Sequence, residues 1–269
     1  MAGKDGNQLI QDEPGGLTPP LSPAELMAIV LSRDLGDGEV GAWGVGSLIP
    51  MAAVLLARAS HAPHIIIGGE RAYNPKPVLN SGLDDPGMMT RIEALEGYWE
   101  LFGHWHRGVD FFCFSGMQVD AFGNLNLHLI GDDLANPTVR GPGVPNISLA
   151  GSCGRTYLFF AEHSKRRFVE RLDFISVPGH MDGQGRKSRA LKGSGPKFCV
   201  TPLCVFEFSP ETHRMFLASV HPGVTVSAVL GATGFEIAVE GEVPVTRQPT
   251  SDEIRRLREV VDPQGLLLG

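Results

Sequence analysis

The sequence predicts an α/β protein: an open, mostly parallel sheet flanked by helices, with a β-rich C-terminal half. In the first 110 or so residues, short apolar runs alternate with helical patterns, as in βαβ units. Further along, short strands separated by Gly- and Pro-containing turns predominate. The chain has 269 residues, 42% of them hydrophobic, which is enough to bury one large core.

The first helix is predicted to begin at Pro23. Ser22 can act as its N-cap, and Glu25 stands where a capping box requires a carboxylate. Residues 1–21 are rich in Gly, Pro and polar side chains, and they predict a flexible leader. No later change in composition divides the chain and no repeat is evident, so we expect one domain over residues 22–269.

The next unit reads as strand, glycine turn and helix. A strand is predicted over 40–43, the turn contains Gly44 and Gly46, and an apolar helix covers 51–59. A helix N-terminus after such a turn can bind an anion. Close packing of the helix on the strand explains the two glycines as well, and the third glycine of the dinucleotide fingerprint is missing.

Residues 62–70 combine a buried strand with a carboxylate. Ile65 to Ile67 predict the strand, Gly68 and Gly69 end it, and Glu70 follows. In open α/β sheets, ligands bind at the carboxyl ends of the strands, so this glutamate is a candidate functional residue. The alternative is an ordinary exposed glutamate after a turn.

The remaining elements follow from periodicity and turn residues. A tight turn is predicted at 120–124, helices over 91–105 and near 224–230, and a C-terminal helix from Ser251 whose charge order suits its dipole. Strands are predicted over 109–114, 126–130, 156–161 and 174–176, and an antiparallel pair over 198–208 and 215–220.

Two loops carry further candidate residues. Residues 140–146 form a Gly- and Pro-rich loop that offers backbone N–H groups. Lys165, Arg166 and Arg167 form a run of three cations. Such a run is either a solvated, ion-paired surface or a group that binds phosphates.

Bulk properties exclude several classes of function. The net charge of −7 argues against non-specific nucleic-acid binding. No apolar run reaches about 18 residues, so no membrane-spanning helix is expected, and the N-terminus lacks the apolar segment of a signal peptide. The four cysteines form no CxxC pair and are interpreted as reduced thiols of a cytoplasmic protein. His106, His128, His180 and His221 are interpreted as having no partner at metal-ligand spacing, so we expect no metal.

The order of several motifs resembles the β-type subunit of family I CoA-transferases, and most closely the glutaconate CoA-transferase type. The resemblance covers roughly residues 22–266 and is most specific in Gln118-Val119-Asp120 with Gly123-Asn124-Leu125-Asn126. The pieces that carry it are Glu25-Leu26-Met27-Ala28, Asp37-Gly38-Glu39-Val40, residues 44–50, Ala62-Pro63, residues 116–126, residues 163–170 and residues 219–224.

The resemblance implies an open α/β fold and a heteromer with a separate α-subunit, possibly α2β2, whose active site lies at the subunit interface. It implies an acyl-CoA substrate, with coenzyme A as a co-substrate and no bound cofactor. Glu70 takes the place of the nucleophile that forms a glutamyl-CoA intermediate. The implied substrate-binding or oxyanion residues are Gly44, Gly46, Gly68, Gly69, Gly141, Gly143 and Asn146, and the implied contacts to CoA phosphate or to the other subunit are Lys165, Arg166 and Arg167.

Two departures from the transferase pattern keep other functions open. The transferase motif continues Glu-Ser-Gly or Glu-Asn-Gly, whereas this chain continues Glu70-Arg71-Ala72, and the loop at 141–146 has lost its paired glycines. Both resemble the β-subunit of the steroid ring-opening, CoA-dependent hydrolase, in which Glu70 would shape the pocket instead of attacking. A non-catalytic partner subunit is the third hypothesis.

Overall fold

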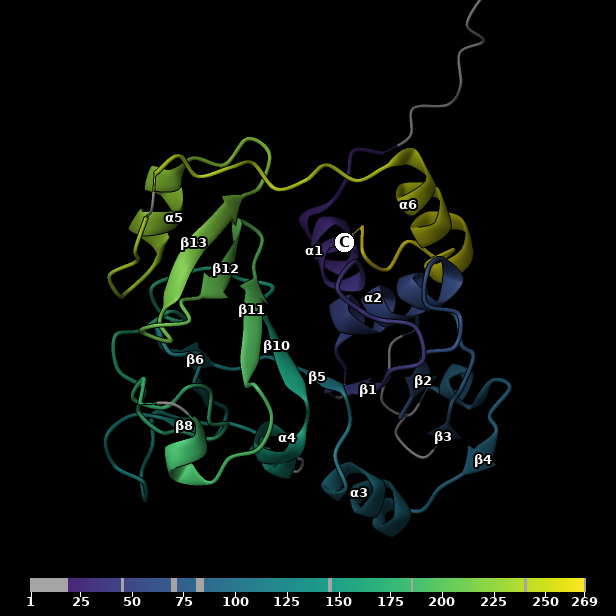
Figure 1. The fold of residues 1–269 in the computed structure, drawn as a ribbon, viewed down its shortest axis with the longest axis horizontal. Helices are drawn as coiled ribbons and strands as arrows, with labels where there is room; N and C mark the ends of the chain where they lie inside the picture. The colour runs from purple at the N-terminus through teal and green to yellow at the C-terminus, as the bar shows by residue number, and fades with distance from the viewer. Residues whose placement is uncertain are drawn as a thin grey trace, which may run out of the picture.

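The computed structural model describes residues 19–44, 46–68, 72–80, 85–144, 147–184, 186–239 and 241–268. Its centre is a seven-stranded sheet in the order β13-β12-β11-β10-β5-β1-β2, which Figure 1 shows running across the molecule. The strand pairs from β2 to β11 are parallel, and the two pairs that add β12 and β13 are antiparallel. The predicted α/β class, with its mostly parallel sheet and β-rich second half, is confirmed.

The helices and strands follow the chain in a simple order. The strands of the main sheet are β1 (Val40–Trp43), β2 (Ile66–Ile67), β5 (Phe111–Phe114), β10 (Arg155–Phe159), β11 (Pro196–Val200), β12 (Cys204–Phe208) and β13 (Met215–Val220). Short ribbons are formed by β3 (Ala72–Tyr73) with β4 (Ala94–Leu95), β6 (Gln118–Val119) with β7 (Leu125–Asn126), and β8 (Leu129–Ile130) with β9 (Val139–Arg140). The helices are α1 (Pro23–Ser32), α2 (Leu48–Ala59), α3 (Tyr98–His106), α4 (Ile147–Ser152), α5 (Val226–Ala232) and α6 (Ser251–Arg256); single turns are η1 (Pro86–Met89), η2 (Arg186–Arg189) and the π-helical η3 (Leu257–Val261).

Side chains of the central strands alternate between two hydrophobic layers. In β5, Phe111 and Cys113 face the layer covered by α1, α2 and η3, whereas Phe112 and Phe114 face the layer that contains residues of α3 and α4. All four are buried, as expected for a parallel strand covered on both faces. Because the strands from β2 to β11 pair in parallel, their carboxyl ends lie along one edge of the sheet.

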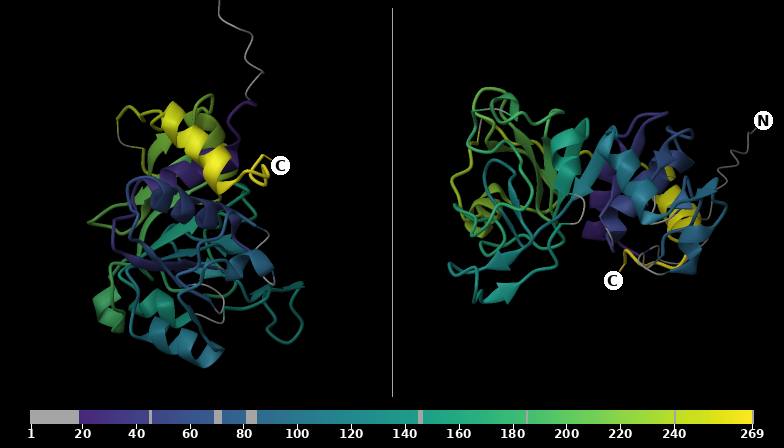
Figure 2. Two further views of the ribbon diagram at one scale, coloured as in Figure 1. Left: turned by 90° about the vertical axis from the view of Figure 1, so that its right-hand side faces the viewer. Right: turned by 90° about the horizontal axis from the view of Figure 1, so that it is seen from below.

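The two ends of the described chain lie on the same face. Figures 1 and 2 show α6 packed beside α2, close to α1. The capping box predicted for the first helix is present, because Ser22 accepts from the Glu25 N–H and Glu25 accepts from the Ser22 N–H. Thr250 and Glu253 cap α6 in the same way. These local motifs fix where both helices begin.

Two predicted elements differ from the structure because their residues pair elsewhere. The helix predicted over 91–105 begins only at Tyr98, because Arg91 is left-handed (φ 49°), Ala94–Leu95 pairs with β3, and Gly97 is the N-cap. The strand predicted over 126–130 is interrupted, with β7 and β8 pairing with different partners.

One further strand prediction is wrong, and another holds in part, because β12 pairs antiparallel with β13 as predicted. Residues 174–176 form no strand. The N–H groups of Ser176 and Val177 both donate to the Leu125 carbonyl, at 2.8 and 3.1 Å, so no regular ladder forms there. The run 198–208 splits into β11 and β12, because the Thr201 hydroxyl accepts from the N–H groups of Leu203 and Cys204 and closes a turn.

Among the described residues, no helix is long and apolar enough to cross a membrane. The carbonyls of Pro19 and Pro20 accept from Arg258, and Leu21 packs against the α1 side of the core. Residues 1–18 of the predicted leader lie outside the described part. The division into a leader over 1–21 and one domain over 22–269 stays a prediction.

Candidate active site at the carboxyl edge of the sheet

A cavity of 540 Å³ opens at the carboxyl ends of β1 and β5. We call it the edge cavity. Its polar lining comes from the turn after β1 and the turn after β5, and its apolar lining comes from β5 and from the loop after β9. The lining residues are Gly44, Ser47, Phe112, Cys113, Phe114, Ser115, Gly116, Met117, Leu127, Pro142, Gly143 and Val144. The structure thus brings three turns that are distant in the sequence to one place.

The N-terminus of α2 points at this edge. Gly46 turns the chain with φ 69°, a conformation that a side chain disfavours, and Ser47 then takes the N-cap position. The first N–H groups of a helix lack intrahelical partners and carry partial positive charge. Ser47 and Ser115 also line a neighbouring cavity of 460 Å³, which the C-terminal residues Leu266 and Leu267 close. An anionic or polarised oxygen at this edge would meet the α2 N-terminus.

The loop at 141–144 forms a wall of the edge cavity. A Cβ on Gly141 would lie 2.2 Å from the Leu127 carbonyl oxygen, so no other residue fits without moving the backbone. The Gly141 N–H donates to the His128 carbonyl at 2.7 Å, and the Gly143 N–H donates to the Leu127 carbonyl at 3.0 Å. Both N–H groups therefore have partners within the chain, and the substrate-binding or oxyanion role of this loop stays a prediction.

The three consecutive cations behave differently from one another. Lys165 is exposed. Arg166 and Arg167 both contact the Glu162 carboxylate, at 3.1 and 3.0 Å. Hydrogen bonds from the Ser164 hydroxyl and from Arg167 lower the pKa of Glu162 to about 2. Arg167 also donates to the Gly116 carbonyl at 3.1 Å and so fastens the turn that lines the cavity. Of the two interpretations of this run, ion pairing is what the structure shows for the two arginines.

Three predicted site residues, Gly69, Glu70 and Asn146, lie outside the described residues. Gly68 is described: its N–H donates to the Gly41 carbonyl at 2.9 Å, at the end of β2. A Cβ on Gly68 would lie 3.0 Å from Nε1 of Trp105. Glu70 follows two residues later in the sequence, so its role rests on that position and on the resemblance.

Sequence reasoning missed Ser47, Ser115 and Gly116 as cavity residues. The signal for the last two was present, since Ser115-Gly116 directly follows the buried strand at 111–114, and in parallel sheets that position faces the ligand edge. No such signal marked the apolar lining residues Phe114, Met117 and Leu127, because apolar residues in a strand pattern predict a buried core position equally well.

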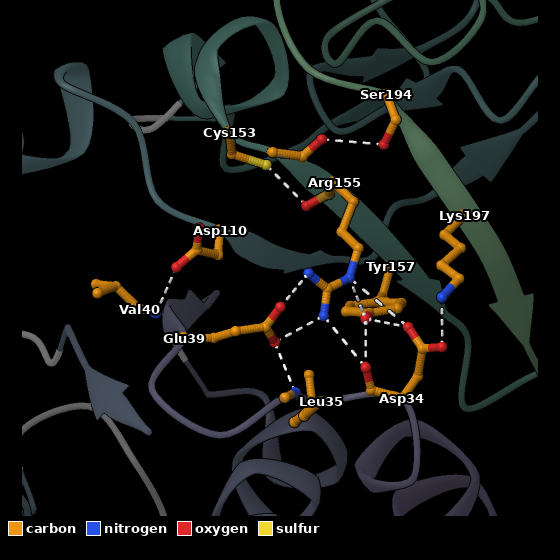
Figure 3. Close-up of polar contacts among 12 residues, drawn as sticks. Asp34, Leu35, Glu39, Val40, Asp110, Cys153, Arg155, Tyr157, Ser194 and Lys197 are labelled. Carbon is orange, nitrogen blue, oxygen red and sulfur yellow. Dashed lines mark hydrogen bonds and ion pairs between the residues drawn. The ribbon is translucent and has the colours of Figure 1, made fainter. Parts of the chain in front are cut away.

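The opposite edge of the sheet holds an ion-pair network (Figure 3). Arg155, at the start of β10, donates to both oxygens of Glu39 at 2.7 and 2.8 Å. The Tyr157 hydroxyl and the Lys197 ammonium group both contact the carboxylate of Asp34. The hydrogen bonds from Arg155 lower the pKa of Glu39, and burial raises the pKa of Tyr157. We call this cluster the amino-edge network; it ties the loop after α1 to β10 and β11.

Comparison with known proteins decides the family. The family described as Coenzyme A transferase matches residues 24–232, which is more than half of the chain. The chain belongs to the coenzyme A transferase family. This family is the one that the sequence motifs indicated, and the edge cavity accordingly belongs to a coenzyme A transferase fold.

Three similar proteins illustrate the range of this family. The B-type subunit of 3-oxoadipate CoA-transferase from Pseudomonas knackmussii is 33% identical over 88% of this chain and 92% of its own length. The cholesterol ring-cleaving hydrolase IpdB subunit of Mycobacterium tuberculosis is 32% identical over 90% of this chain and 96% of its own. The crystal structure of glutaconate coenzyme A-transferase from Acidaminococcus fermentans matches with a TM-score of 0.81 and 26% identity, covering 92% of this chain and 97% of that one.

The described residues contain no group of three or more His, Cys, Asp or Glu side chains that could hold a metal ion. All four cysteines are buried and free. Among the described residues, Ser47, Cys113 and Ser115 line the edge cavity, and they supply its polar groups together with the backbone of the adjoining turns.

Proposed function

We propose that this chain is the β-subunit of a heteromeric enzyme that acts on acyl-CoA thioesters and transfers CoA between carboxylic acids. The similarity to the B-type subunit of a CoA-transferase over 88% of the chain carries this proposal. The edge cavity supports it, because the α2 N-terminus supplies N–H donors where a thioester oxygen would gain charge. A separate α-subunit completes the site, and a cytoplasmic location fits the four free thiols.

In this mechanism Glu70 is the nucleophile. Its carboxylate oxygen attacks the thioester carbonyl carbon, the C–S bond breaks, and CoA leaves as a thiolate from a mixed anhydride. The thiolate attacks the glutamyl carbonyl carbon and releases the first carboxylate, which leaves an enzyme–CoA thioester. The acceptor carboxylate then attacks that thioester, and the reverse sequence returns Glu70 and a new acyl-CoA. Glu70 can act at neutral pH because a carboxyl group is ionised there.

The second candidate is a CoA-thioester hydrolase that opens a carbon ring. Two observations favour it: the 32% identity to a ring-cleaving hydrolase subunit over 90% of the chain, and Arg71-Ala72 in place of the residues that follow a transferase glutamate. Here Glu70 shapes or polarises the pocket and forms no covalent bond. The hypothesis of a non-catalytic partner subunit leaves Glu70 without any chemical role.

A trapping experiment separates these functions. The complex with the α-subunit is incubated with an acyl-CoA, treated with borohydride or hydroxylamine, and digested for mass spectrometry of the peptide that contains Glu70. Transferase chemistry gives a modified Glu70, and Glu70→Gln lowers kcat by at least about a thousandfold. Glu211→Gln, an exposed carboxylate in the turn before β13, is the control and keeps full activity.

Turnover without any modified Glu70 supports the hydrolase instead. If Glu70→Ala leaves turnover unchanged in an assembled heteromer, the chain is a non-catalytic partner. Omitting the α-subunit abolishes activity under either enzymatic hypothesis, because the site is then incomplete.

A further inference from the structure

A further cavity, of 340 Å³, lies beneath the edge of the sheet formed by β1 and β2, against α3. We call it the α3 cavity. Residues that define it are Val40, Gly68, Tyr73, Glu96, His104 and Trp105. The rings of Trp105 and Phe112 are 5.9 Å apart in an edge-to-face contact, and Phe112 lines the edge cavity. One aromatic contact therefore separates the two cavities on the same face of the sheet.

Glu96 is the unusual side chain of the α3 cavity. It lies between β4 and α3, and its side chain is only 7% exposed. Its Oε1 lies 2.7 Å from Nδ1 of His104. Its Oε2 is buried and has no hydrogen-bond partner in the described part of the chain. A buried carboxylate oxygen without a donor is costly, so native proteins rarely keep one without a function.

The surroundings of Glu96 indicate which donor fits. Val40, Ala94, Trp105 and Val109 make the walls apolar. Arg107 also lines the cavity and disfavours a cationic ligand there. A neutral O–H or N–H on an otherwise apolar group satisfies both conditions, because it supplies the missing hydrogen bond and buries its apolar remainder.

We propose that the α3 cavity binds part of the CoA thioester through a neutral donor that hydrogen bonds to Glu96 Oε2. This inference rests on the proposed action on acyl-CoA. Two parts of such a substrate carry this chemistry: a hydroxyl on the acyl group and an amide N–H of the pantetheine arm. Gly68, at the end of β2, lines the cavity, and in the sequence it stands two residues before Glu70.

Entry of the ligand requires one neighbouring side chain to move. Solvent does not reach Oε2 in the free chain, so something must be displaced before a donor can reach it. The His104 ring contacts the same carboxylate and is 53% exposed, so it has room to shift toward solvent when a ligand enters. Glu96 is thus a binding and specificity residue, covered by His104 when the cavity is empty.

Binding of three probes to the complex with the α-subunit tests this inference. The probes are CoA, butyryl-CoA and 3-hydroxybutyryl-CoA, and dissociation constants come from calorimetry. The variant is Glu96→Gln, which replaces one of the two acceptor oxygens by an N–H₂ donor and removes the negative charge, so that His104 and the ligand compete for one weaker acceptor. The control is Glu100→Gln, which removes an exposed carboxylate from α3.

The two sources of the donor give different results. If the acyl hydroxyl is bound, the wild type prefers 3-hydroxybutyryl-CoA to butyryl-CoA by about tenfold, and Glu96→Gln removes that preference. If the pantetheine amide is bound, Glu96→Gln weakens all three probes by about tenfold. Glu100→Gln behaves as the wild type in both cases. A thermal melt adds a further readout: a purely structural Glu96 predicts a lower Tm for Glu96→Gln, whereas our inference predicts an equal or higher Tm without ligand.

Equal affinities of wild type and Glu96→Gln for all three probes overturn the inference and leave the proposed function intact. A wild-type complex that binds none of the probes contradicts both. Should Glu96→Gln fail to fold, Ala94→Leu fills the cavity from its exposed side while keeping Glu96. It is expected to weaken the same probes by a similar factor, and unchanged affinity would again overturn the inference.

Discussion

At the scale of single residues, backbone geometry and burial restrict which side chain a position can hold. Gly141 sits against the Leu127 carbonyl, where a Cβ would lie only 2.2 Å from the oxygen, and thereby keeps the wall of the edge cavity close to β7. His163 is held between the hydroxyls of Thr201 and Thr233, at 2.9 and 3.0 Å, and stacks on Phe168. At Gly141 the lack of space restricts the side chain, whereas at His163 burial disfavours a charged ring.

Replacing Gly141 tests the limit of space. Gly141→Ala is expected to lower the free energy of unfolding by about 1–3 kcal/mol, because the backbone at Leu127 has to move. Gly103→Ala is the matched control: it lies inside α3 with open space around it and is expected to raise the free energy of unfolding by roughly 0.5–1 kcal/mol. Urea denaturation measures both. A stabilising Gly141→Ala would contradict the contact.

The pH dependence of stability tests the limit of charge. Burial lowers the pKa of His163 from 6.5 to about 4, so between these values the unfolded chain binds the proton more readily. Its contribution is complete above about pH 6.5 and is lost as the pH falls toward 4, by up to about 3 kcal/mol.

Denaturation at several pH values between 7 and 4 measures this effect. His163→Gln is expected to show a flatter dependence than the wild type. Identical slopes for the wild type and His163→Gln would rule out His163 as a source of the effect.

At the scale of elements, a buried ion pair joins α1 to η3. Glu25 of α1 is 2% exposed, and its oxygens accept from Arg258 of η3 at 2.6 and 2.9 Å. The same carboxylate closes the capping box with Ser22. Glu25 therefore has two roles. It caps its own helix, as the local sequence predicts, and it also binds α1 to η3 through Arg258.

Breaking this pair should be costly. Arg258→Met is expected to lower the free energy of unfolding by about 3 kcal/mol, because it leaves the buried Glu25 carboxylate without its cation. Arg255→Met removes an exposed pair with Asp252 and is expected to cost less than about 1 kcal/mol. Urea denaturation of both variants measures the difference. Equal losses of unfolding free energy would show that the buried pair stabilises the protein no more than the exposed pair does.

At the scale of the whole molecule, the two edges of the sheet have separate tasks. The carboxyl edge carries the edge cavity and leads to Glu70, whereas the amino edge carries the Arg155, Glu39 and Asp34 network (Figure 3). The strands between them are buried on both faces and continuously paired. Stability and chemistry can therefore be altered separately.

Arg155→Met tests this separation. It removes the cation that contacts Glu39 and is expected to lower the free energy of unfolding by roughly 2–3 kcal/mol. Turnover of the assembled complex with acyl-CoA, measured well below the melting temperature, is expected to stay within about twofold of wild type, since changes at distant sites act independently. A large loss of kcat with unchanged folding would show that the two edges are coupled.

The sequence by itself determined what short-range chemistry controls. The Ser22–Glu25 capping box, the turn at 120–124 and the strand at β1 follow from neighbouring residues, and the motif order at 116–126 and 163–170 was enough for the family. The tertiary structure decided what depends on partners distant in the chain. It turned part of a predicted helix into β4 through pairing with β3, and it gave the Gly141 and Gly143 N–H groups to backbone carbonyls instead of to a ligand. It also left Glu96 buried with one oxygen unpaired, which no local pattern signals, because burial is a property of the whole packed chain.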